Sequence, residues 1–100
     1  MKTSNFLRRA TAKDLVMFAT PSLWPVRPFL PLTRQLPERN QTELGLLYDA
    51  RGASGLFGYG ATVFRVNLLD LPATEAEFLA LPHYTYDTFE ELADYGWVVD

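Results

Sequence analysis

Apolar residues recur at every second position through much of the segment from Glu43 to Leu69. The first run places Leu44, Leu46 and Tyr48 between smaller or polar residues, and the second run alternates Phe64, Val66 and Leu68 with Arg65 and Asn67. This period of two puts successive side chains on opposite faces of a β-sheet. Glycine and other turn-forming residues separate the two runs. The segment is therefore predicted to be a central β-hairpin.

The alternation changes phase inside this hairpin. Phe57 and Tyr59 occupy odd positions, whereas the large apolar residues from Phe64 onward occupy even ones. Gly58 and Gly60 lie at the change, and glycine adopts the positive φ that some bulges require without a steric penalty. We therefore expect a β-bulge at these two glycines.

The stretch before the hairpin is rich in proline, with five prolines from Pro21 to Pro37. Proline has no N–H to donate to a neighbouring strand, which confines it to sheet edges and bulges. Phe29 to Gln35 is accordingly predicted to be an edge strand. It is expected to pair with Glu43 to Asp49 through a polar loop from Leu36 to Thr42.

Helix start signals occur at three places in the chain. Thr11, Thr74 and Asp87 each offer a side-chain oxygen for an N-cap and are followed three residues later by an acidic side chain. Pro21, Pro82 and Gly96 end the corresponding apolar patterns. Three short helices are expected. The residues from Trp97 to Val99 are predicted to form a last short strand, and Trp97 is expected to be buried as the hydrophobic partner of the last helix.

These elements indicate an α+β fold. We expect a small antiparallel sheet of three to four strands, formed by the central hairpin Glu43–Leu69 and the edge strand near Phe29–Gln35, covered by about three short helices. Residues 1–10 are polar and basic without clear periodicity and are predicted to be a flexible N-terminus. Residues 11–100 are predicted to form a single α+β domain.

The amino-acid composition excludes several kinds of catalytic and metal-binding site. The chain has no cysteine and one histidine, His83, which excludes disulfides, thiol catalysis and the common structural zinc sites. We therefore expect no cofactor and no metal. No stretch approaches the roughly 18 apolar residues that cross a bilayer, and the first residues lack the apolar core of a secretory signal. The predicted location is the cytoplasm, with no membrane partner.

Charge is divided unevenly along the chain. Residues 1–39 carry seven basic and two acidic side chains, a net charge of +5, whereas residues 40–100 carry two basic and ten acidic ones, a net charge of −8. The favoured interpretation is that the two halves attract each other in the folded domain. The alternative is a phosphate-binding N-terminus. Since only four cations are closely spaced there, nucleic acid is not the expected partner.

Two groups of residues are candidates for function. Asp49, Arg51 and Tyr59 lie near one end of the hairpin, where with His83 they could form a small ligand site. The alternative is that Asp49 and Arg51 pair across the turn while His83 belongs to a linker. Trp24 and Phe29 could form an interaction surface within the proline-rich stretch, or could instead close the core.

The leading functional hypothesis is a non-enzymatic protein-interaction or accessory domain with an unidentified protein partner. The alternative is a small enzyme or ligand-binding domain that uses the hairpin end with His83. A further alternative is weak nucleic-acid binding through the basic N-terminus.

Overall fold

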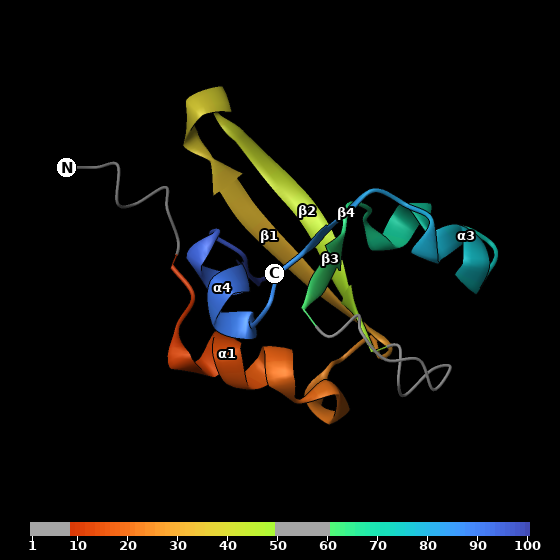
Figure 1. The fold of residues 1–100 in the computed structure, drawn as a ribbon, viewed down its shortest axis with the longest axis horizontal. Coiled ribbons are helices and arrows are strands. Elements are labelled where there is room, and N and C mark those ends of the chain that lie inside the picture. Colours follow the sequence, from red (N-terminus) through yellow and green to blue (C-terminus); the bar gives the residue numbers. More distant parts are fainter. Residues whose placement is uncertain (1–8, 50–60) are drawn as a thin grey trace.

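A single antiparallel sheet dominates the computed structural model, which describes residues 9–49 and 61–100 (Figure 1). The described strands lie in the order β4-β3-β2-β1-β5. Their bounds are Phe29–Leu36 for β1, Gln41–Tyr48 for β2, Thr62–Phe64 for β3, His83–Thr85 for β4 and Val98–Val99 for β5. The α+β prediction is confirmed, with five strands in the described residues rather than three to four.

β1 and β2 form a long two-stranded arm whose register runs from Phe29↔Tyr48 to Leu36↔Gln41. The arm confirms the predicted pairing, but β1 is not an edge strand. Val99 pairs with Leu32 and so places β5 beside β1. Pro31 is compatible with this inner position because its carbonyl accepts the N–H of Asp100 at 3.1 Å. Proline lacks only the donor, so the acceptor side of the ladder is kept.

The connection between the two arm strands is shorter than predicted. A 3₁₀ turn covers Pro37–Arg39, and Asn40 follows in the left-handed conformation with a φ of 51°. Asparagine tolerates this conformation better than most residues. Strand pairing therefore includes Leu36 at one end of the predicted loop and Gln41 and Thr42 at the other.

The central hairpin is only partly as predicted. β2 pairs with β3 through Leu46↔Phe64 and Leu47↔Val63, but β3 ends at Phe64. The chain then turns into a 3₁₀ helix over Leu68–Asp70, which Asn67 caps by accepting the N–H of Leu69. This local cap competes with strand pairing, as asparagine side chains commonly do. The expected bulge at Gly58 and Gly60 lies outside the described residues.

β4 occupies a segment that the sequence analysis assigned to a linker. His83–Thr85 pairs with β3, with Tyr84 opposite Val63. The alternation of Tyr84, Thr85 and Tyr86 is a period-two pattern, but it is too short to identify a strand by itself. Pairing with β3, which is distant in sequence, makes this segment a strand.

The three predicted helices are present as α1 (Ala12–Ala19), α3 (Glu75–Leu79) and α4 (Phe89–Asp94). Thr11 and Asp14 form the expected reciprocal capping box of α1. The cap of α4 is shifted by one residue, because Thr88 rather than Asp87 accepts the N–H of Glu91. The carboxylate of Glu91 accepts the N–H of Asp87 in return.

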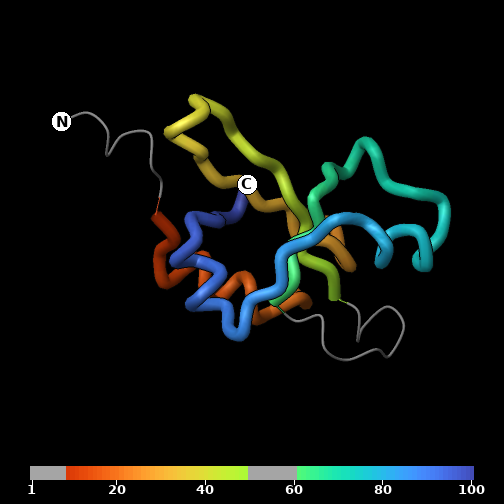
Figure 2. The backbone as a smooth tube through the Cα atoms, turned by 45° about the horizontal axis from the view of Figure 1, so that its top comes forward, coloured from red at the N-terminus to blue at the C-terminus, as the bar shows by residue number. Residues whose placement is uncertain are grey.

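The helices cover opposite faces of the sheet. α1 and α4 contact each other and pack on the face that carries Leu47 and Val63, as Figure 2 shows by their adjacent red and blue traces. α3 packs on the other face, where Phe78 contacts the cluster of Leu46, Tyr48 and Phe64. Because both faces are covered, consecutive strand residues such as Leu46 and Leu47 are both buried. This explains why a simple alternation does not describe β2.

The C-terminal segment follows the prediction closely. Gly96 has a φ of 97°, as expected for the residue that ends a helix with a left-handed turn. Trp97 is fully buried, and β5 follows directly. Among the described residues, no helix has the length and apolar character needed to cross a membrane.

Candidate functional site

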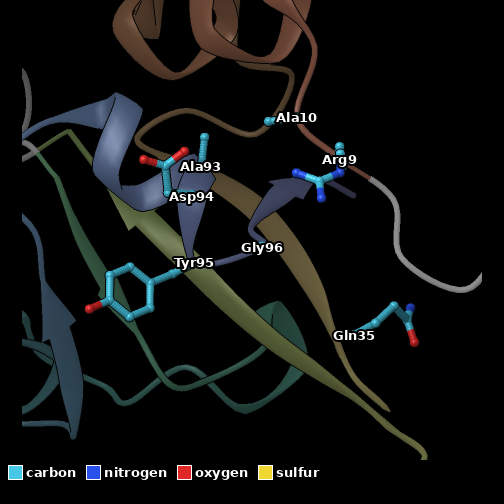
Figure 3. A pocket seen from close by; sticks show the side chains of 7 residues that line it. All are labelled: Arg9, Ala10, Gln35, Ala93, Asp94, Tyr95 and Gly96. Atoms are coloured by element: carbon cyan, nitrogen blue, oxygen red, sulfur yellow. The ribbon is translucent and has the colours of Figure 1, made fainter. Parts of the chain in front are cut away.

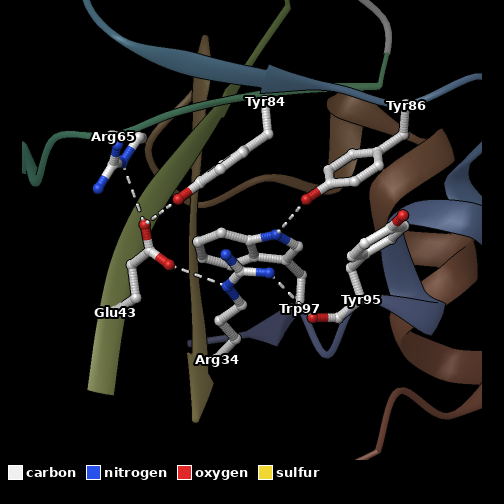
Figure 4. Close-up of polar contacts among 7 residues, drawn as sticks. All are labelled: Arg34, Glu43, Arg65, Tyr84, Tyr86, Tyr95 and Trp97. Atoms are coloured by element: carbon white, nitrogen blue, oxygen red, sulfur yellow. Dashed lines mark hydrogen bonds and ion pairs between the residues drawn. The ribbon is translucent and has the colours of Figure 1, made fainter. Parts of the chain in front are cut away.

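Glu43 is the centre of a polar cluster on the sheet face that α1 and α4 partly cover (Figure 4). Its carboxylate accepts hydrogen bonds from Arg34 Nε at 2.9 Å, Arg65 Nε at 3.2 Å and the hydroxyl of Tyr84 at 3.0 Å. The side chains of Glu43 and Arg34 are only 13% and 12% exposed. The carboxylate is therefore held by three donors from three different strands or strand ends.

The guanidinium of Arg34 lies in a corner between two aromatic rings, whose centroids are 6.2 Å apart. The ring centroids of Tyr84 and Trp97 lie 4.9 and 4.7 Å from its Cζ atom. Its Nη1 also donates to the carbonyl of Tyr95 at 3.2 Å. Contact with two aromatic rings is a favourable environment for a guanidinium, because the face of an aromatic ring carries partial negative charge.

The position of Trp97 depends on Gly45 in β2. A Cβ atom at Gly45 would lie 2.4 Å from Cγ1 of Val63 and 3.1 Å from the Trp97 ring. The absence of a side chain at Gly45 thus allows the indole to lie against the strand. Its Nε1 donates to the hydroxyl of Tyr86 at 3.1 Å. This contact connects the buried indole to the tyrosines nearer the surface.

A depression of about 440 Å³ lies beside this cluster. Its lining consists of Arg34, Tyr84, Thr85, Tyr86, Glu91 and Tyr95. We call the four-residue group Arg34, Tyr84, Tyr86 and Tyr95 the tyrosine surface. Burial raises the pKa of the Tyr86 phenol above its usual value, which keeps this group neutral at ordinary pH. The surface therefore offers aromatic rings and hydroxyls beside one guanidinium.

Tyr95 also borders a second hollow on its other side (Figure 3). This hollow has a volume of about 330 Å³ and is lined in addition by Arg9, Gln35 and Asp94. The rings of Tyr86 and Tyr95 lie 5.0 Å apart, while Tyr95 remains 58% exposed. Tyr95 is therefore the ring most available to a molecule that approaches from solvent.

The acidic group of this cluster is already engaged by its neighbours. The Glu43 carboxylate is already engaged by two guanidinium groups and a phenol, so it is poorly placed to act as a general base. Among residues 9–49 and 61–100, no group of three or more acidic or histidine side chains is arranged to hold a metal ion. The described contacts fix rings and charges rather than present a nucleophile.

The structure does not join Asp49 and His83 in one site. Asp49 follows the end of β2 and pairs with Arg27, with an Oδ2 to Nη2 distance of 3.4 Å. His83 lies in β4, level with Phe64, and its Nδ1 is 2.7 Å from the carbonyl oxygen of Leu81. The other two candidates of the predicted ligand site, Arg51 and Tyr59, lie outside the described residues.

Trp24 and Phe29 both contribute to the core. Trp24 is 7% exposed, and its Nε1 donates to the carbonyl of Met17 at 2.7 Å. Phe29 is partly buried and stacks on Tyr48 with a centroid distance of 5.4 Å. This agrees with the alternative interpretation of the proline-rich stretch, in which these rings close the core and offer little area to a partner.

Comparison with known proteins found no matching protein-family model, no matching curated protein and no matching solved structure. The tyrosine surface was missed in the sequence analysis because its members come from distant segments. Only the spacing of Tyr84 and Tyr86 carried a signal, since two tyrosines separated by one residue point to the same face of a strand.

Proposed function

We propose that this chain is a non-enzymatic protein-binding domain whose contact region is the tyrosine surface. The single observation that carries the proposal is the gathering of Tyr84, Tyr86 and Tyr95 around Arg34 beside a depression on the surface of the sheet. Tyrosine, tryptophan and arginine are enriched at the centres of protein interfaces, where they supply most of the binding energy.

Rigidity supports the same proposal. Arg34 is held by Glu43, by two aromatic rings and by the Tyr95 carbonyl, so its conformation is set before any partner arrives. Side chains that are already ordered lose less conformational entropy on binding. A partner would therefore gain contacts with the rings at a smaller entropic cost than on a surface of mobile side chains.

The enzymatic alternative has less support. The Nδ1 atom of His83 is engaged by the carbonyl of Leu81, and its ring lies 5.1 Å from the Phe64 ring, so the imidazole is packed against its own chain. Asp49 pairs with Arg27 at the end of a different strand. We therefore prefer binding to catalysis for the described part of the chain.

Affinity capture with two matched variants tests the proposal. Tyr95→Ala removes the exposed ring of the tyrosine surface, whereas Leu23→Ala removes a comparably exposed side chain elsewhere, since the two residues are 58% and 54% exposed. We expect a partner protein that the wild-type chain retains to be lost with Tyr95→Ala and kept with Leu23→Ala. The captured partner is then purified and its affinity for each variant measured by calorimetry.

Equal affinities for all three chains would contradict the proposal. Circular dichroism and thermal melts must first show that both variants fold like the wild type. Loss with Leu23→Ala alone would place the contact near the 3₁₀ turn Pro21–Leu23 and would equally overturn the proposed surface.

A further inference from the structure

We propose that two copies of this chain associate through β4, so that one antiparallel sheet runs through both. The inference rests on the proposed function, because β4 carries Tyr84 and ends one residue before Tyr86, and both belong to the tyrosine surface. It adds the identity of one partner, a second copy, and a defined pairing geometry.

β4 is the outermost described strand on its side of the sheet. The N–H of Arg65 donates to the carbonyl of Pro82 at 2.9 Å, and the N–H of Tyr86 donates to the carbonyl of Ala61 at 3.0 Å. In an antiparallel ladder, hydrogen-bonded pairs alternate with pairs that are not hydrogen-bonded. The backbone N–H and C=O groups of Tyr84 therefore point toward β3, whereas those of His83 and Thr85 point away from β3.

Apart from its short length, this edge lacks the usual protection against pairing. Natural edge strands are commonly blocked by lysine, by proline or by a bulge. His83 and Thr85 are exposed and are neither lysine nor proline. Pro82 does not block the edge either, because its nitrogen belongs to the side that faces β3. Two outward donors and two outward acceptors are thus available for a second strand.

If two copies are related by a two-fold axis at Tyr84, each of these outward donors meets an outward acceptor of the other copy. His83 of one copy then faces Thr85 of the other in a hydrogen-bonded pair, and the two Tyr84 residues face each other in the closer pair without hydrogen bonds. Cross-strand aromatic pairs stabilise such positions. The two tyrosine surfaces meet at this axis and form one larger contact region.

The edge is self-complementary, which favours a second copy as the occupant. The outward N–H and C=O groups of His83 in one copy meet those of Thr85 in the other, so that each donor finds an acceptor. The short length of β4 limits the number of new hydrogen bonds, so the dimer is weak and concentration-dependent.

The oligomeric state of the full chain tests this inference. We expect sedimentation equilibrium to show the mass rising with concentration from 11.4 kDa toward twice that value. Thr85→Pro removes an N–H that points to the free edge, a position at which edge strands tolerate proline, and it should abolish the rise. Thr85→Val keeps the N–H and the branched shape, so it should dimerise like the wild type.

A cysteine trap provides a second measurement, because the natural chain contains no cysteine. Tyr84→Cys should form an intermolecular disulfide in air, since facing residues at a close strand pair fall within the Cα separations that disulfides span. Glu38→Cys, on the exposed turn of the arm, should cross-link much more slowly. If Thr85→Pro fails to fold, the relative rates of these two variants decide the question.

A wild-type chain that stays monomeric up to its solubility limit would overturn the dimer, as would equal cross-linking of the two cysteine variants. A folded Thr85→Pro variant that still dimerises would overturn the pairing through β4. In each case, a separate partner that depends on Tyr95 would leave the proposed function standing. Conversely, a dimer whose chains capture no Tyr95-dependent partner would support β4 pairing and contradict the wider binding role.

Discussion

The residue that most constrains this molecule carries no side chain. Gly45 lies in the middle of β2, beneath the indole of Trp97 and against Val63. Trp97 in turn supports one face of the Arg34 guanidinium and donates to Tyr86. The close packing at Gly45 is therefore connected to the tyrosine surface through the contacts of Trp97 with Arg34 and Tyr86.

Gly45→Ala should destabilise the fold by about 1–3 kcal/mol, as is typical of overpacking in a filled core. The added Cβ would lie 2.4 Å from Cγ1 of Val63, so the sheet or the side chain must shift. Urea denaturation followed by tryptophan fluorescence measures the loss. In a Val63→Ala background the same substitution should cost less, because the nearest clashing atom is gone. Equal costs in both backgrounds would show that Val63 is not the obstacle.

Glu43 offers a second residue-scale prediction. Glu43→Ala should lower the free energy of unfolding by on the order of 3 kcal/mol, because it leaves the nearly buried guanidinium of Arg34 without its carboxylate. Glu38→Ala, on the exposed turn of the same arm, should change stability by less than about 0.5 kcal/mol. Chemical denaturation of both variants gives the comparison. A small effect of Glu43→Ala would mean that the aromatic rings alone suffice to hold Arg34.

At the scale of elements, the helices could be predicted and parts of the sheet could not. A helix start depends on residues three positions apart, such as Thr11 and Asp14, so the sequence contains its signal locally. Even the error at α4 is local, since Thr88 and Asp87 are neighbouring cap candidates and the hydroxyl of Thr88 reaches the N–H of Glu91.

β4 has no comparable local signal. It is formed by pairing with β3, far away in the sequence, and three residues do not establish a period. The last short strand was expected from Trp97 to Val99, but no local pattern indicated that it pairs with β1. The same limitation hid the candidate site. Arg34, Glu43 and Tyr84 come together only when β1, β2 and β4 are placed in one sheet, and no spacing along the chain encodes that arrangement.

The attachment of α3 to the sheet leads to a prediction at alkaline pH. Tyr48 ends β2, its ring contacts Phe29 of β1 and Phe78 of α3, and its hydroxyl donates to the Glu75 carboxylate. Burial, this hydrogen bond and the nearby charges of Glu75 and Asp49 raise the pKa of Tyr48 from 10.0 to about 12. The folded state therefore retains the phenol proton where the unfolded chain loses it.

The stabilisation that comes from the Tyr48 phenol is fully present below about pH 10 and is lost as the pH rises toward about 12. The loss amounts to at most roughly 1.4 kcal/mol for each unit by which the pKa in the folded state exceeds that in the unfolded chain. Urea melts across this range should show unfolding free energy falling with pH. Tyr48→Phe cannot ionise at this position, so its decline should be shallower. Parallel curves for the two proteins would assign the alkaline loss to other groups, such as Tyr86.

At the scale of the whole molecule, the two oppositely charged halves of the sequence meet in the fold. The described ion pairs Arg27–Asp49 and Arg34–Glu43 each join a basic residue of the first 39 positions to an acidic residue after them. Arg65 from the acidic half adds a further cation to Glu43. Part of the basic charge is thereby neutralised within the domain, which supports the interpretation that the halves attract each other.

This internal neutralisation bears on nucleic-acid binding. The phosphate backbone of a nucleic acid binds to cationic side chains that are not already paired. The more phosphates a protein contacts, the more steeply its affinity falls as the salt concentration rises. Arg27 and Arg34 already pair with carboxylates, and the net charge of the chain is −3. We therefore predict only weak, sequence-independent binding, with dissociation constants at or above roughly 10⁻⁴ to 10⁻⁶ M at physiological salt. Fluorescence anisotropy with labelled duplexes and single strands measures this directly. Asp49→Asn would free Arg27 and should raise the affinity slightly, whereas sub-micromolar binding that depends on base sequence in the wild type would show that a dedicated nucleic-acid surface exists.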